Sequence, residues 1–182
     1  FITEINKQND SKAAASEMEH AIRKHCKVNE GDDPVMYKRF SDKLEEVLKK
    51  YNENWDQMLL ELDSLREEID KGRGDDSGSG DPFADVIIAI AFEGACSDDE
   101  QAAVKAVVDQ IMDTLADTID TLNFWDRPAQ VTTLEGKLNK VFILSKVKAL
   151  ILNKAQLTTE VMDLAKRREA DILASSNTGA KK

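Results

Sequence analysis

The chain has two histidines, His20 and His25, and neither belongs to a set of residues that could carry out catalysis. On a helix, their five-residue spacing turns them about 140° apart, which excludes paired zinc ligands on one face. There is no GxxxxGK[ST] loop for nucleotide phosphates and no GxGxxG motif after a strand. There is also no D…ExK pattern of the kind that holds Mg²⁺ for phosphodiester cleavage. The sequence therefore predicts a chain that is not itself an enzyme and has no metal or cofactor site.

The residues best suited to a binding function are basic side chains that avoid the apolar helical stripes. Lys and Arg bind the phosphates of duplex DNA through contacts that depend on salt and carry little sequence information. Ordinary solvated lysines would show the same pattern, so both interpretations stay open. The candidate contacts to DNA or to a partner are Arg23, Lys24, His25, Lys27, Arg127, Lys137, Lys140, Lys148, Lys166, Arg167 and Arg168.

The position of His25 next to a predicted helix end allows two roles. It could hydrogen-bond nearby backbone carbonyls, or it could make a polar contact to a neighbouring domain or to a phosphate. Lys38 and Arg39 follow closely in sequence and would extend this smaller basic group.

The acidic clusters and the cysteines have structural explanations. Asp32 and Asp33, like residues 98–100, stand where helices are expected to begin, so capping and the helix dipole account for them. Cys26 and Cys96 have no CxxC partner and no ligand cluster nearby, which predicts buried free thiols.

Charge is spread unevenly along the 182 residues, whose formal net charge is −10. Residues 1–72 contain 12 Lys/Arg and 17 Asp/Glu, residues 73–126 contain 2 and 13, and residues 127–182 contain 11 and 5. The overall acidity argues against a free-standing DNA-binding protein. The basic last third suggests that one face could meet an anionic partner.

Helical periodicity recurs throughout, and alternating strand patterns are nearly absent. We therefore expect an all-α fold, an irregular bundle of about six to seven helices in two lobes. Residues 1–71 form the first lobe with a helix hairpin, residues 72–81 a flexible linker rich in Gly, Ser and Asp, residues 82–174 the second lobe, and residues 175–182 a disordered tail.

Several helix starts can be read directly from the sequence. Asp33 and Asp81 each precede a proline, a cap followed by a residue that suits the first helical turn. Ser97 with Glu100 has the spacing of a capping box, and Asp126 could cap the helix that follows it. The run of residues 52–54 interrupts a long apolar stripe, which indicates either a helical hairpin or one kinked helix.

The apolar segments are all too short to span a membrane, and there is no secretory signal pattern. We therefore expect a cytoplasmic location. Because the chain starts at Phe1 in the middle of a pattern, we also expect it to be a fragment of a longer polypeptide. The two tryptophans, Trp55 and Trp125, could stack on nucleobases, but their places beside apolar stripes favour the core.

A long stretch of the first lobe resembles a known family. It reads IR-x-H, then DP-x-x-Y-x-x-x-S-x-x-L-E, then an NW pair. This pattern resembles the carboxy-terminal helical region of type I restriction-modification motor (R) subunits and, within that family, the IC subfamily. The matching residues are Ile22, Arg23, His25, Val28, Asp33, Pro34, Tyr37, Ser41, Leu44, Glu45, Val47, Leu48, Tyr51, Asn54 and Trp55.

Two later segments extend the resemblance in the same order. Residues 123–140 are similar to a late W-x-x-(R/N)-P segment of the family, and residues 164–168 to its closing helix. The chain departs from the family where further histidines often occur, since it has Cys26 and Asn29 there. A role that needs a histidine pair is therefore not expected, and residues 82–106 match poorly.

The resemblance implies a place in a larger ATP-driven machine. Type I restriction enzymes combine specificity, methyltransferase and motor subunits, and the motor carries a Mg²⁺-dependent nuclease domain and two RecA-like ATPase lobes. By this resemblance the chain is the non-catalytic end of a type I site-specific deoxyribonuclease, with ATP and Mg²⁺ bound elsewhere in its parent. We expect it to dock the rest of the motor onto the methyltransferase and specificity subunits and to contact double-stranded DNA in the bacterial cytoplasm. The alternative is a purely structural interaction module with no DNA role.

Overall fold

The computed structural model describes the backbone of residues 2–72 and 79–179, with side chains described for residues 10–72 and 79–175. The described backbone forms nine α-helices and one short 3-10 helix, and it contains no strand. The all-α prediction is confirmed, with more helices than the six to seven expected. The chain divides into two compact units, Phe1–Ser77 and Gly78–Lys182, and the division lies inside the range predicted as a linker.

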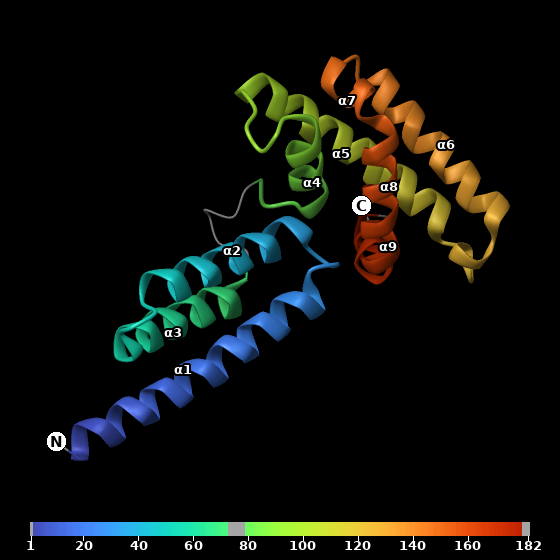
Figure 1. Cartoon of the computed structure of the whole chain (residues 1–182). Coiled ribbons are helices and arrows are strands. Elements are labelled where there is room, and N and C mark those ends of the chain that lie inside the picture. Colours follow the sequence, from blue (N-terminus) through green and yellow to red (C-terminus); the bar gives the residue numbers. More distant parts are fainter. Residues whose placement is uncertain (1, 73–78, 180–182) are drawn as a thin grey trace. The chain divides into compact units, whose positions relative to one another are not determined.

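Unit 1 is a bundle of three helices, α1 (Ile2–Asn29), α2 (Pro34–Lys50) and α3 (Trp55–Lys71), each packed on the other two (Figure 1). The apolar positions recur three or four residues apart, so each helix presents one stripe to the centre. The buried side chains that fill this core are Ala15, Ile22, Cys26, Met36, Phe40, Leu44, Met58, Leu62, Leu65 and Ile69.

Helices α2 and α3 form an antiparallel hairpin, which decides between the two interpretations of the interrupted stripe. Asn54 caps α3, its side chain accepting a hydrogen bond from a backbone N–H of the first turn. Two side-chain contacts show the register, an ion pair between Lys43 and Glu68 and a hydrogen bond from Tyr51 to Glu61. The sequence separation of the partners shrinks toward the turn, as antiparallel pairing requires.

The helix starts predicted from the sequence are confirmed at three positions. The Asp33 carboxylate accepts a hydrogen bond from the Met36 N–H of α2 at 3.2 Å. Asp81 caps α4 (Pro82–Ala91) through two backbone N–H groups, at 2.8 and 3.1 Å. Ser97 and Glu100 form a complete capping box on α5 (Asp98–Ile119). These side chains satisfy backbone donors that have no partner within the helix.

The prediction that Asp126 caps the next helix is wrong. Asp126 lies in the 3-10 helix η1 (Phe124–Asp126), and α6 (Pro128–Leu144) begins after Arg127 without a side-chain cap. The 3-10 turn carries the chain one residue past Asp126, so its carboxylate does not stand at the cap position. Pro128 makes the start possible because the first turn needs no N–H from it.

Unit 2 continues with α7 (Lys148–Leu152), α8 (Lys154–Arg167) and α9 (Glu169–Gly179) (Figure 1). Helix α6 packs on α5 and on α8, while α8 also packs on α4. Asn139 of α6 and Thr158 of α8 are joined by a hydrogen bond of 3.3 Å. Since only the short α7 separates these two helices, they run antiparallel, and we call them the α6–α8 hairpin.

The ends of several elements differ from the sequence predictions. Helix α1 starts at Ile2, and residues 2–10 contain no Gly or Pro that would interrupt it. The tail predicted to be disordered from residue 175 is helical as far as Gly179, since residues 169–178 also lack a breaker and buried Ile172 anchors the helix. Helix α5 ends at Ile119, and Leu122, three residues farther on, is 81% exposed.

The predicted linker of residues 72–81 is described only at its ends. Gly72 ends α3 with a φ of +69°, a conformation that costs glycine little. Residues 73–78 lie outside the described part of the chain, as do residues 180–182 of the predicted tail. Within the described residues, no helix has both the length and the apolar character needed to cross a bilayer.

Candidate functional site

The first basic group lies at the carboxyl end of α1. Arg23, Lys24, His25 and Lys27 are all exposed there, on the last two turns of the helix. The connection to α2 is short, so Lys38 of the first turns of α2 belongs to the same end of unit 1. The connection itself contains Glu30, Asp32 and Asp33. The potential at this end is therefore mixed, which weakens the case for a phosphate site.

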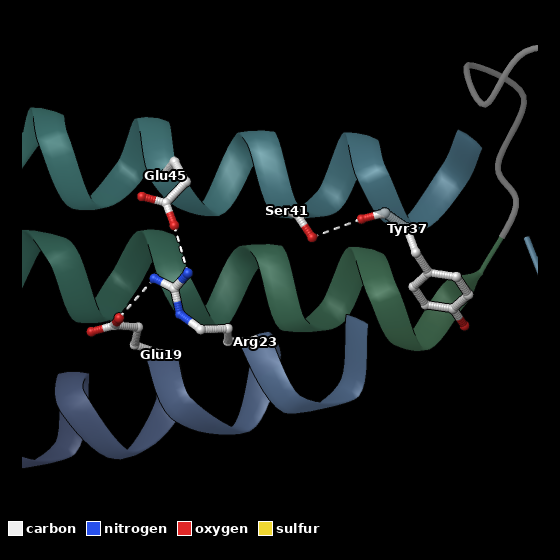
Figure 2. Close-up of polar contacts among 5 residues, drawn as sticks. All are labelled: Glu19, Arg23, Tyr37, Ser41 and Glu45. Carbon is white, nitrogen blue, oxygen red and sulfur yellow. Dashed lines mark hydrogen bonds and ion pairs between the residues drawn. The ribbon is translucent and has the colours of Figure 1, made fainter. Parts of the chain in front are cut away.

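Arg23 is part of a cross-link between helices rather than a free cation. Figure 2 shows its guanidinium between two carboxylates, with Nη1 donating to Glu45 of α2 at 2.7 Å and Nη2 to Glu19 of α1 at 3.0 Å. The hydrogen bonds to Glu19 and then to Glu45 raise the pKa of Arg23. Its donors hold α1 on α2, so its assignment as a partner contact loses its main support.

The ring of His25 lies 5.8 Å from the ring of Tyr37, centroid to centroid, in a tilted arrangement. Burial, followed by the nearby charge of Asp33, raises the pKa of Tyr37. The Tyr37 carbonyl accepts a hydrogen bond of 3.0 Å from the Ser41 hydroxyl (Figure 2). The aromatic contact links α1 to α2 at this end, while the exposure of His25 keeps its contact role open.

The candidate residues of unit 2 are sorted to the two ends of the α6–α8 hairpin. The Asn139–Thr158 hydrogen bond marks where the two helices are level. Arg127 lies twelve residues before Asn139, directly ahead of α6, and Arg167 lies nine residues after Thr158 on α8. At about 1.5 Å per residue they stand roughly 14–18 Å toward the open end. Lys140 lies beside the Asn139–Thr158 hydrogen bond and Lys148 lies beyond it, toward α7, so the candidates do not form one compact cluster.

Two of these cations have partners inside the unit. Lys137 Nζ donates a hydrogen bond to Thr118 Oγ1 of α5 at 3.0 Å. Lys137 and Lys140 are both exposed and lie three residues apart on α6. Arg168 is paired with Asp171 at 3.2 Å. Besides Lys137, the exposed candidates of unit 2 are Arg127, Lys140, Lys148, Lys166 and Arg167.

Residues 136–159 form the most basic part of the chain. This stretch contains five lysines and no Asp, Glu or Arg, within a protein whose formal net charge is −10. It covers the closed end of the α6–α8 hairpin, where α6 ends, α7 forms and α8 begins. The exposed face of α5 is acidic, since Asp109, Asp113, Asp117 and Asp120 are all exposed. Unit 2 therefore displays both signs of charge on separate elements.

A set of exposed apolar side chains at this same closed end was not predicted from the sequence. Ile143, Leu144 and Leu152 are 48%, 59% and 72% exposed. They could have been found from the sequence, because these three residues do not follow the helical spacing of the buried residues Leu138, Phe142 and Leu150. Exposed aliphatic groups among lysines are a common feature of interaction surfaces.

The remaining candidates for chemistry have structural roles. Cys26 is buried, and burial raises the pKa of its thiol, whereas Cys96 is only half-buried, so the prediction of two buried thiols holds for Cys26 alone. The described residues contain no group of three or more possible metal ligands. The rings of Trp125 and Phe124 pack edge to face with their centroids 5.1 Å apart. The Lys12 Nζ lies over the ring of Trp55, 5.2 Å from its centroid.

Comparison with protein-family models, with curated proteins and with solved structures finds no match to this chain. The likeness to type I restriction motor subunits therefore rests on the motif residues alone.

Proposed function

We propose that this chain is a non-catalytic docking domain of a type I restriction-modification motor subunit, and that it contacts duplex DNA without reading its sequence. In this proposal the parent polypeptide carries the ATP-dependent translocase and endonuclease activities, with their ATP and Mg²⁺, in other domains. The chain would join the motor to the methyltransferase and specificity subunits in the bacterial cytoplasm. The order of the motif residues from Ile22 to Trp55 supports the family.

The observation that carries the DNA contact is the acid-free stretch of residues 136–159. Its lysines stand on a helical hairpin whose backbone is fixed by a buried core, including Leu134, Leu138, Phe142 and Leu157, each 0% exposed. Exposed cations on a rigid element can neutralise phosphates and release condensed counterions. Such contacts position a protein on DNA and carry no sequence information.

The experiment compares the chain with a variant in which Lys140 and Lys148 are both changed to Glu. A fluorescent 25-base-pair duplex is titrated at several salt concentrations, and binding is followed by anisotropy. Loss of two phosphate contacts should make the slope of log K against log salt shallower by about 1.8. If the affinities converge near 1 M salt, binding at 0.1 M salt falls by about 60-fold.

The matched control changes Lys49 and Lys105, two exposed lysines outside the candidate groups, to Glu. It alters the net charge by the same amount and should leave the salt slope in place. Equal losses for the two variants would show that only net charge matters, and no loss for either would remove the DNA contact. A pull-down of the methyltransferase core with the parent motor, with and without this domain, tests the docking role separately.

A structural interaction module without a DNA role is the second candidate function. The exposed Ile143, Leu144 and Leu152 favour it, because phosphates gain nothing from aliphatic side chains. This candidate predicts that changing Lys140 and Lys148 leaves duplex affinity unaltered, while assembly with the partner is lost when the domain is removed.

A further inference from the structure

The closed end of the α6–α8 hairpin concentrates apolar side chains in solvent. Of the six large hydrophobic side chains that are strongly exposed in the described residues, three lie between positions 143 and 152. We call residues 140–154 the α6–α7 corner. Its exposed aliphatic residues are Ile143 and Leu144 at the end of α6 and Leu152 at the end of α7. Grouped exposure of this kind marks an interaction site more often than scattered exposure does.

The backbone of the α6–α7 corner is held in place, so these side chains are presented on a fixed support. The Ser145 hydroxyl donates to the Phe142 carbonyl at 2.7 Å and accepts from the Val147 N–H at 3.2 Å. Lys146 takes a φ of +59°, in the left-handed region that residues other than glycine adopt infrequently. Leu150, 0% exposed, anchors α7 to the core. A fixed support lowers the entropy lost when a partner binds.

All charged side chains of residues 136–159, the stretch that contains the corner, are positive. Lys140, Lys146 and Lys148 are exposed and Lys154 is half-buried, and no acidic residue occurs from 136 to 159. A ligand that covers the corner must therefore offer apolar groups together with negative charge, because buried lysines without a counter-charge would lose their hydration uncompensated.

Three classes of anionic ligand meet this requirement to different degrees. Duplex DNA offers phosphates but no aliphatic surface for the leucines. An anionic bilayer offers both, but segments that lie on it do so through a long apolar face of Trp, Phe and Leu, whereas the corner exposes three aliphatic side chains and its one aromatic residue, Phe142, is 0% exposed. An acidic amphipathic helix offers an apolar stripe flanked by carboxylates, which matches leucines flanked by lysines.

We propose that the α6–α7 corner docks an acidic amphipathic helix of a partner protein. Ile143, Leu144 and Leu152 contact the apolar stripe of that helix, and the lysines around them pair with its carboxylates. The proposal builds on the proposed function, because it gives the docking role a surface and a partner chemistry. Since Lys140 and Lys148 are also the DNA candidates, an occupied corner excludes duplex DNA from the same lysines.

The probe is a labelled 20-residue peptide designed as a helix, with Leu at i, i+3, i+4 and i+7 positions and Glu on the flanks. A second peptide of the same composition in scrambled order has no apolar stripe. Binding to the full chain is measured by anisotropy at low and high salt. The first peptide should bind at least about tenfold more tightly than the scrambled one, because only it buries leucine side chains.

The decisive variant changes Leu144 and Leu152 to Ser, and the matched control changes Leu60, an exposed leucine of α3 in unit 1, to Ser. The double variant should weaken peptide binding by at least about tenfold while duplex binding is unchanged. The Leu60 variant should bind like the unaltered chain. Because all three positions are exposed, circular dichroism should show the same helix content in each protein.

The outcomes separate this proposal from the proposed function. Absence of duplex binding with intact peptide binding removes the DNA role alone. Equal binding of the two peptides, or equal effects of the two leucine variants, overturns the corner as a docking site. Two other occupants would also overturn it. They are a second copy of the chain, seen as dimers by light scattering that the double variant abolishes, and vesicles of anionic lipid that the double variant fails to bind.

Discussion

The two units have separate cores, and we predict that a core cavity in one unit leaves the other unit intact. Leu62 is 0% exposed in the core of unit 1. Changing it to Ala should cost about 3–5 kcal/mol, the lost transfer free energy plus the cavity left behind. A unit of this size is expected to be stable by roughly 4–12 kcal/mol, so the loss is a large part of the total.

The chain contains its own reporters for this test. Its two tryptophans are divided between the units, Trp55 in unit 1 and Trp125 in unit 2. Changing Trp125 to Phe leaves fluorescence that reports unit 1 alone, and changing Trp55 to Phe leaves a report of unit 2. With a urea slope of about 1–1.5 kcal/mol per M, the Leu62→Ala change should lower the Trp55 midpoint by about 2 M or more. The Trp125 midpoint should stay where it is.

Leu60→Ala supplies the matched control. It is the same chemical change two positions away on α3, at a side chain that is 66% exposed, and it should cost no more than about 0.5 kcal/mol. Leu138→Ala, at a position 0% exposed in unit 2, should produce the reverse pattern. If Leu62→Ala moved both tryptophan transitions together, or cost no more than Leu60→Ala, the assignment of two independent cores would be refuted.

Two further predictions concern charged groups. A double-mutant cycle with Arg23→Met and Glu45→Gln should give a coupling of about 0.2–1 kcal/mol by urea unfolding, because both side chains are at least half exposed. Duplex affinity should not change in either single variant, and a clear loss on Arg23→Met would return this residue to the contact surface. Hydrogen bonds from the Ser97 N–H and then its hydroxyl lower the pKa of Glu100 below its ordinary value of 4.5. The stabilisation is therefore present above pH 4.5 and disappears as the pH falls through the lowered pKa. Glu100→Gln should accordingly cost unit 2 more stability at pH 7 than at pH 3, and equal costs at both values would contradict the capping role.

The local features of this chain could be predicted because their causes lie within a few residues of one another. A cap such as Asp33 or Ser97 bonds to a backbone N–H three residues on, so sequence spacing is enough to identify it. The apolar stripes follow from the same short periodicity. Asp126 was wrongly predicted as a cap because a short 3-10 helix can be mistaken in sequence for the start of an α-helix. In the structure Asp126 is the last residue of η1, and Arg127 occupies the cap position of α6.

The basic candidates could be named from sequence, but their availability could not. Arg23 is bonded to Glu45, 22 residues away, and Lys137 to Thr118, 19 residues away. Such pairs depend on which helices pack together and in what register. The spacing of residues along a single helix does not reveal either. The same limit explains why the exposure of Leu144 and Leu152 was missed.

From the sequence alone, then, came the helical class, the starts of α2, α4 and α5, and the acid-free stretch of residues 136–159. Tertiary packing decided that the interrupted stripe is an antiparallel hairpin, that the cations of unit 2 divide between two ends of α6 and α8, and that three aliphatic side chains remain in water. The reason is physical. Backbone hydrogen bonds and helix periodicity act over one turn, whereas burial and side-chain pairing act between residues that the fold alone brings into contact.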